Sequence, residues 1–179
     1  VTLDLAGSTG LADVNDEEVA CGSAVDSPAS QGFLRKRSGV VLPLAPIAGY
    51  PWSTAARINH DGFVLGTSSS STSSAATLWS PAGTAMALPD LGWSQSLPIA
   101  LSDSGVVLGK GEIAGTWSPW IWDAVNGTRW LASLGFPSGG DPIAPEANDM
   151  DSSGRVAGNT WRGQSFVFDL ASGTSTSLG

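Results

Sequence analysis

The sequence of 179 residues carries a formal net charge of −8 at pH 7, and 41% of its residues are hydrophobic. This composition is typical of a globular chain with a buried core and excludes an intrinsically disordered one. The average negative field repels polyanions, so we expect no nucleic-acid partner. No apolar run approaches the length needed to span a bilayer, so we expect no membrane insertion. The chain begins at Val1 without a signal peptide, and we expect it to be a processed or truncated form.

Residues 1–5 (VTLDL) alternate apolar and polar side chains, which predicts a short half-buried strand. Two roles are open for this strand. It either pairs with the last sheet of the chain and closes a ring, or it adds an edge strand.

Four segments of the chain match one another position by position. Each has an apolar residue in the fourth place, then polar turn residues, then a short apolar run closed by glycine, which predicts a β-hairpin. The segments are residues 11–22, 55–66, 98–109 and 147–158, and their closing glycines recur at intervals of 43 to 49 residues. A period of about 45 residues is typical of a repeat array.

A third and a fourth short strand follow each hairpin, so each unit contains four antiparallel strands. The sequence predicts one repeat domain over 1–179, with repeats at about 11–54, 55–97, 98–146 and 147–179. A single sheet cannot bury both faces, so the repeats must pack on one another. We therefore predict an all-β fold, a small β-propeller of four four-stranded repeats, with an open β-solenoid or a two-sheet sandwich as the alternative.

The motifs of these repeats resemble a known family. The second repeat reads ARINHDGFVLG, ATLWSPAGT and LPDLG, and the third reads PIALSDSGVVLG, PWIWD and NGTRWLASLG. This pattern resembles the bacterial HAF family of extracellular repeats, although the His-Ala pair of that family is replaced in every copy. The resemblance implies a secreted or envelope-associated, propeller-like domain, and it transfers no catalytic residue.

Few side chains are suited to catalysis. His60 is the one histidine and occupies a turn position, while the lone Cys21 occupies a core position of its hairpin. A Ser-His-Asp set or a zinc site therefore has too few members, and we expect no enzyme activity. Glu112 and Glu146 are the acid pair that a glycoside-acting enzyme would need, and we expect both to be solvated loop residues.

The stretch DMDSSG, residues 149–154, imitates the start of a calcium loop. The twelfth position of such a loop would be Thr160, which lacks the bidentate carboxylate that calcium needs there. We therefore expect a hairpin turn and no cofactor, with calcium as the alternative.

The sequence contains eight tryptophans, and their positions are the most informative feature for predicting a binding site. Four lie at strand positions and are predicted to be core: Trp79, Trp120, Trp122 and Trp130. The aromatic residues placed in connections are Trp52, Trp93, Phe136, Trp117 and Trp161. Aromatic rings repeated in the loops between blades would stack on sugars, so these five residues are candidate ligand-binding residues. Two arginines are added to them: Arg162, which follows Trp161, and Arg57, on the first strand of the second repeat.

Two polar stretches are assigned simple roles. The serine-rich stretch 68–74 is predicted to be a flexible surface loop. Asn126-Gly127-Thr128 has the form of a glycosylation sequon, but a tight turn is sufficient to explain it.

The predicted function is a secreted, non-catalytic binding or adhesion module located outside the cell or in the envelope. Its expected partner is a carbohydrate or another cell-surface ligand, bound through the aromatic loops. The alternative is a scaffold for protein–protein interaction, and a glycoside-acting enzyme is the third hypothesis.

Overall fold

The computed structural model describes residues 8–26, 29–137, 146–160 and 162–179. The strand predicted at residues 1–5 lies outside these ranges. Strands account for 56% of the residues and helix for 3%, so the fold is all-β, as predicted. The described part of the chain holds no helix of the length and apolarity that a membrane span requires.

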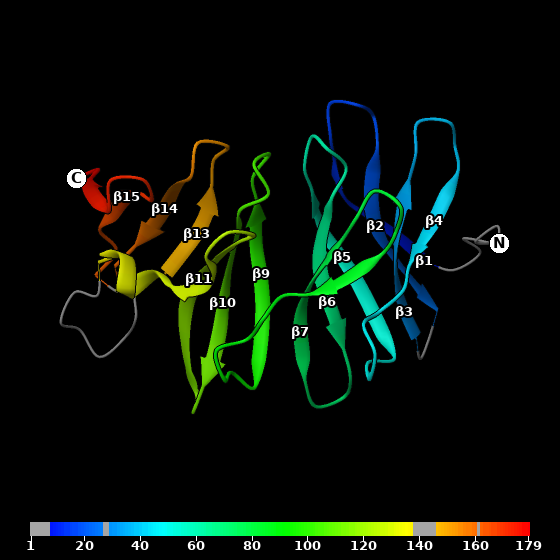
Figure 1. Ribbon diagram of the computed structural model, residues 1–179, viewed down its shortest axis with the longest axis horizontal. Helices are drawn as coiled ribbons and strands as arrows, with labels where there is room; N and C mark the ends of the chain where they lie inside the picture. The colour runs from blue at the N-terminus through cyan, green and yellow to red at the C-terminus, as the bar shows by residue number, and fades with distance from the viewer. Residues whose placement is uncertain (1–7, 27–28, 138–145, 161) are drawn as a thin grey trace. The chain divides into compact units, whose positions relative to one another are not determined.

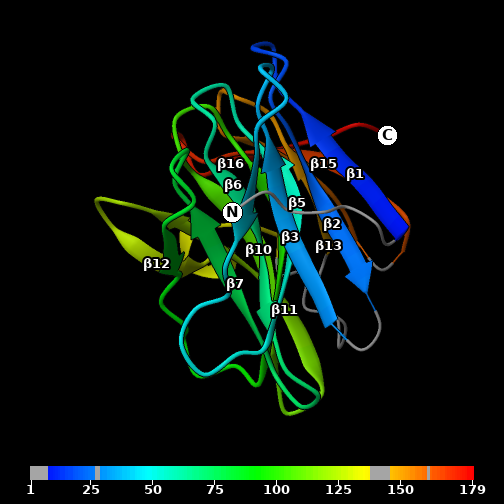
Figure 2. The same ribbon diagram turned by 90° about the vertical axis from the view of Figure 1, so that its right-hand side faces the viewer.

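The chain divides into two compact units, Val1–Leu88 and Pro89–Gly179. The first unit contains two four-stranded antiparallel meanders, in which each strand pairs with the next along the chain (Figure 1). Figure 2 shows β1, β2 and β3 running alongside one another. The strands are β1 (Ser8–Val14), β2 (Ala20–Asp26), β3 (Ala29–Arg35) and β4 (Val41–Leu44), then β5 (Trp52–Ile58), β6 (Val64–Ser69), β7 (Ser74–Trp79) and β8 (Ala85–Ala87).

The second unit repeats this arrangement, with two further meanders in chain order. Its strands are β9 (Gln95–Leu101), β10 (Val107–Ile113), β11 (Thr116–Asp123) and β12 (Gly127–Trp130), then β13 (Glu146–Met150), β14 (Arg155–Asn159), β15 (Ser165–Asp169) and β16 (Thr174–Ser177). A short 3-10 helix, η1 (Leu131–Leu134), follows β12. The four meanders span residues 8–44, 52–87, 95–130 and 146–177.

The first turn of every repeat is closed by the same hydrogen bond. A side-chain oxygen at the start of the turn accepts the backbone N–H of the residue four positions later, at 2.9 to 3.0 Å. The accepting residues are Asn15, Asn59, Ser102 and Asp151. This is the usual reason for Asn, Asp and Ser at turns, and it explains the polar residues that the sequence places there.

The closing glycines are required by close packing between strands. Each one pairs with the first strand beside a β-bulge, where that strand carries one extra residue. A Cβ atom on Gly66 would lie 1.9 Å from the carbonyl oxygen of Thr54, and one on Gly109 would lie 2.2 Å from the Trp120 ring. No side chain fits at these positions.

Each unit has its own buried core. In the first unit Cys21, Leu34 and Leu44 of one meander pack with Ile58 and Trp79 of the next. In the second unit the core contains Leu108, Ile121, Leu131, Phe136, Val156 and Phe168. Trp79, Trp120 and Trp122 are buried, as predicted, whereas Trp130 is half-buried.

The serine-rich stretch is a loop only over residues 70–73, where Ser71 and Thr72 are exposed, so the prediction is wrong at both of its ends. Ser68 lies on β6 and is fully buried, and Ser74 begins β7. The Ser68 hydroxyl accepts the Ile47 N–H at 3.1 Å and the Thr77 hydroxyl at 2.9 Å. These hydrogen bonds offset the cost of burying a hydroxyl, which sequence polarity alone does not show.

Candidate ligand-binding surface

Trp93 lies in the connection between β8 and β9 and is half-buried. Its indole stacks on Trp120, with ring centroids 5.3 Å apart and an interplanar angle of 18°. The edge of Trp130 lies 5.5 Å away at 79°. A Cβ on Gly111 would lie 2.4 Å from the Trp93 ring, so this glycine lets the indole lie flat against β10. Trp93 is therefore held in one orientation by two tryptophans and a glycine.

Glu112 provides a carboxylate at the same end of the sheet, on the face of β10 opposite to Gly111 and Trp93. It lies on β10 and accepts hydrogen bonds from the hydroxyl of Ser94, the residue after Trp93, and from the N–H of Gly115. The Ser94 hydroxyl, followed by the Gly115 N–H, lowers the pKa of Glu112. The carboxylate is consequently ionised at neutral pH and is held in a fixed position.

Trp117 lies at the same end of this sheet. It occupies β11 and pairs with Glu112, so the prediction that it sits in a connection is wrong. The strand extends past the apolar run on which the prediction rested. Because side chains alternate along a strand, Trp117 and Trp120 lie on opposite faces. The Lys110 ammonium lies 5.5 Å from the Trp117 ring centroid, which is the geometry of a cation–π contact.

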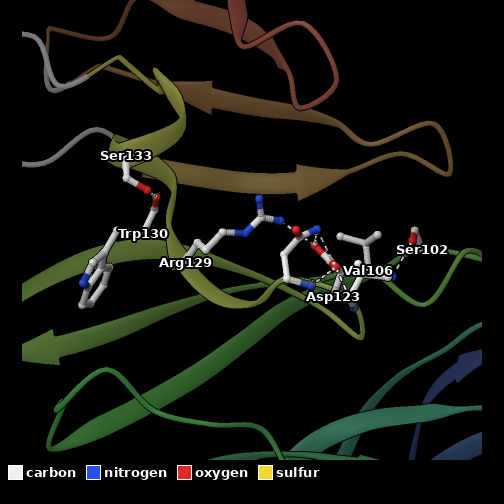
Figure 3. A network of polar contacts seen from close by, with 8 residues as sticks. Ser102, Val106, Asp123, Arg129, Trp130 and Ser133 are labelled. Carbon is white, nitrogen blue, oxygen red and sulfur yellow. Dashed lines mark hydrogen bonds and ion pairs between the residues drawn. The ribbon is translucent and has the colours of Figure 1, made fainter.

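A polar network closes the turn between β11 and β12 (Figure 3). Asp123 accepts the N–H groups of Val125 and Asn126 at 3.0 and 2.8 Å, and it pairs with Arg129. Burial opposes ionisation of Asp123, but the Asn126 N–H and side-chain amide, with Val125 and Arg129, lower its pKa overall. The amide of Asn126 is thus engaged in the turn, as its turn assignment predicts.

Three other sequence-predicted residues lie on other elements of the chain: Trp52, Arg57 and Arg162. Trp52 begins β5 in the first unit and is half-buried, so it lies on a strand and not in the predicted connection. Arg57 is exposed, and its guanidinium donates to the Ala56 carbonyl at 2.9 Å. Arg162 is exposed, and Trp161 lies outside the described residues.

Phe136 belongs to the core, which corrects its assignment to an exposed loop. It is 3% exposed, and its ring contacts Phe166 and Phe168 at centroid distances of 5.2 and 5.4 Å. The chain turns inward after η1, so a residue between two elements becomes buried. An aromatic residue in a connection is therefore not by itself evidence of a binding surface.

The stretch 149–154, which resembles the start of a calcium loop, contains a turn whose hydrogen bonds to Asp151 come from Ser153 and Arg155. Asp151 accepts the Ser153 hydroxyl at 2.7 Å and the guanidinium of Arg155 at 2.8 Å. The Ser153 hydroxyl, then the Arg155 N–H, hold the pKa of Asp151 well below its usual range. No group of three or more His, Cys, Asp or Glu side chains among the described residues is placed to hold a metal ion.

The thiol of Cys21 has low reactivity. Cys21 is fully buried, and burial raises the pKa of its thiol to about 12, with the nearby Asp13 charge adding to the effect. The thiolate, which is the reactive form, is therefore scarce at neutral pH. His60 is exposed in the turn between β5 and β6.

Neither a scan against protein-family models nor a search of curated proteins found a match. Among solved structures, TolB from Acinetobacter baumannii has a TM-score of 0.65 at 11% identity, over 96% of this chain and 43% of TolB. A putative TolB from Agrobacterium tumefaciens has a TM-score of 0.65 at 12% identity, and the match covers 96% of this chain and 61% of that protein. A gluconolactonase from Xanthomonas campestris has a TM-score of 0.52 at 16% identity, and the match covers 94% of this chain and 60% of that enzyme.

These three structures are β-propeller proteins, so the likeness is one of fold. The chain spans less than two thirds of the length of each. At such low identity a shared fold carries no activity or ligand.

Proposed function

We propose that this chain is a four-bladed, HAF-like β-propeller that acts as a secreted, non-catalytic carbohydrate-binding module. The four successive meanders and the propeller fold of the similar structures support the architecture over an open solenoid or a sandwich. The binding role is supported by the surface around Trp93.

The single observation that carries the proposal is the fixed, partly exposed indole of Trp93. Sugars present apolar C–H faces that stack on aromatic rings, and a ring already held in place loses little entropy on binding. Trp120 and Trp130 provide that support for Trp93.

A sugar site also needs polar groups that fix the hydroxyls. Glu112 is hydrogen-bonded to Ser94, the residue after Trp93, and its ionised carboxylate is a strong acceptor for sugar hydroxyls. Trp117, in register with Glu112, lies on the opposite face of the sheet from Trp120 and Trp93, so it is outside this site. We place the ligand on the exposed part of the Trp93 ring, with Glu112 as a polar group at the same end of the sheet.

The test is a titration of intrinsic tryptophan fluorescence with a panel of neutral and acidic oligosaccharides. We expect a saturable change with one sugar class. The Trp93→Ala and Glu112→Gln variants should each weaken that affinity by about tenfold, which corresponds to about 1.4 kcal/mol. The matched control is Trp52→Ala, which removes a half-buried indole from the other unit and should leave the affinity unchanged.

Folding of each variant is checked by circular dichroism. Because Trp93→Ala also removes packing from Trp120, Trp93→Phe serves as a second variant that keeps a ring in place. A flat response of the native protein to the whole panel contradicts the proposal. Equal loss in the Trp52 variant would place the ligand elsewhere.

A further inference from the structure

A hollow of about 400 Å³ lies between the first two repeats of the chain. It is lined by residues of the turns 15–19, 36–38 and 60–62, together with Leu34 and Pro81. All of these residues belong to the first unit, so the hollow is defined within one compact part of the chain. Its volume falls in the range of small-molecule sites, about 300 to 1,000 Å³.

Asn15 fixes one wall of this hollow. Its side-chain N–H groups donate to the carbonyls of Asn59 and His60, at 3.0 and 3.2 Å. Its side-chain oxygen accepts the N–H groups of Glu17 and Val19, at 3.1 and 2.9 Å. These bonds tie the first turn of one repeat to the first turn of the next. The wall is therefore formed before a ligand arrives, which lowers the entropy cost of binding.

Lys36 departs from the pattern of its turn. In the other three repeats, a side-chain oxygen at this position accepts backbone N–H groups of the same turn at 2.8 to 3.2 Å. The accepting residues are Ser80, Asp123 and Asp169. An ammonium group only donates, so Lys36 cannot close its turn in this way. Such a break with a local rule is expected where a residue serves function.

The hollow carries charges of both signs. Lys36 lines it from one turn, while Glu17 and Asp61 line it from two others. Among the described residues, these three side chains take part in no ion pair, either with one another or with other groups. The guanidinium of Arg37, by contrast, is already paired with Glu18 at 3.3 Å. One cation and two anions therefore line the same hollow without partners of opposite charge.

We propose that this hollow binds a small zwitterion, a free amino acid or a short peptide. The ligand's carboxylate meets Lys36, and its ammonium group meets Glu17 and Asp61. A ligand with one charge alone would leave the opposite sign in the hollow unmatched. Val19 is half-buried and Leu34 is buried, and both line the hollow, so they offer apolar contact to an aliphatic side chain. This site is independent of the proposed sugar site, which lies in the other unit.

The test is an NMR titration of the ¹⁵N-labelled chain at low salt, with leucine and with the dipeptide Leu-Leu. We expect saturable shifts of the backbone amides in the turns 15–19, 36–38 and 60–62, and none around Trp93. The tighter of the two ligands distinguishes a free amino acid from a peptide. Because the contacts are exposed ion pairs, Lys36→Gln and Asp61→Asn should each weaken the affinity by up to about fivefold.

Blocked forms of the tighter ligand assign each charge to its wall. The N-acetyl form lacks the ammonium group and the amide form lacks the carboxylate, so each should bind more weakly than the free ligand. Affinity for the N-acetyl form should still fall with Lys36→Gln, but it should no longer fall with Asp61→Asn. Affinity for the amide form should show the reverse.

Two matched controls test whether the effect is local. Lys110→Gln removes the other lysine of the sequence, and Asp16→Asn removes an exposed acid of the turn 15–19 that does not line the hollow. Both should leave the affinity close to that of the native chain. An absence of shifts in the three turns with either ligand would overturn the proposal. Equal binding of the free and blocked ligands would overturn it as well.

Discussion

Glu18 occupies the fourth position of the turn between β1 and β2 with a φ of 58°. The equivalent turn positions in the other repeats hold Gly62, Gly105 and Gly154, with φ of 80° to 84°. A side chain in this left-handed region clashes with its own backbone, at a cost of about 1 kcal/mol. Glu18 is therefore a strained residue at a position where the other repeats have glycine.

We predict that Glu18→Gly stabilises the protein by about 0.5 kcal/mol. Relief of strain outweighs the loss of the exposed ion pair between Glu18 and Arg37, because such pairs contribute about 0 to 1 kcal/mol. Urea denaturation measures the change. Glu17→Gly, at an ordinary φ in the same turn, is the control and should destabilise; equal effects of the two substitutions would show that strain is not the cause.

At the scale of the element, the bulge and its glycine define each repeat. Gly66 lies on β6 opposite Ala55, and the bulge brings the Thr54 carbonyl to the place where a Cβ would stand. In three repeats an aromatic ring of the third strand also covers the glycine, as Phe33 covers Gly22. The glycines mark a close approach of two strands and a ring.

We predict that Gly66→Ala destabilises the protein by at least about 1–3 kcal/mol, the usual cost of overpacking, because backbone must move to admit the methyl group. The measurement is the free energy of unfolding in urea. Gly10→Ala is the matched control, since Gly10 lies on strand β1 of the same unit and a Cβ there meets nothing within 4 Å. A cost no larger than that of the control would refute the packing argument.

The strand order of each repeat could be predicted from the sequence because turn residues and apolar runs recur at fixed offsets. The bulges could not, since an extra residue in one strand changes pairing without changing the hydrophobic pattern. Ser68 was misplaced for a related reason: its partners, Ile47 and Thr77, are supplied by tertiary structure.

The candidate surface was predictable only in part. Trp93 is in the predicted connection, but its support by Trp120 and Trp130 depends on how the connection folds back over the sheet. Glu112 entered the sequence analysis only as an acid for catalysis. Its place beside Trp117 follows from the hairpin register of β10 and β11, which becomes visible once the turn between them is fixed.

At the scale of the whole molecule, charge imbalance is the main electrostatic feature. The sequence has 16 acidic and 8 basic residues. Ion pairs among the described residues include Arg37 with Glu18, Arg129 with Asp123, and Arg155 with Asp151. Because carboxylates outnumber the lysine and arginine side chains two to one, their mutual repulsion at neutral pH opposes the folded state.

We predict that salt stabilises the protein at pH 7. Raising the ionic strength from 0.01 to 0.15 M shortens the screening length from about 30 to about 8 Å, which weakens repulsion between distant carboxylates. The melting temperature should rise by a few degrees. At a pH near 4.3, the pI calculated from the sequence, adding the same amount of salt should change the melting temperature little, because the net charge of the protein is close to zero. Calorimetry at a fixed protein concentration measures this change. A melting temperature that falls with salt at pH 7 would mean that the ion pairs outweigh the repulsion.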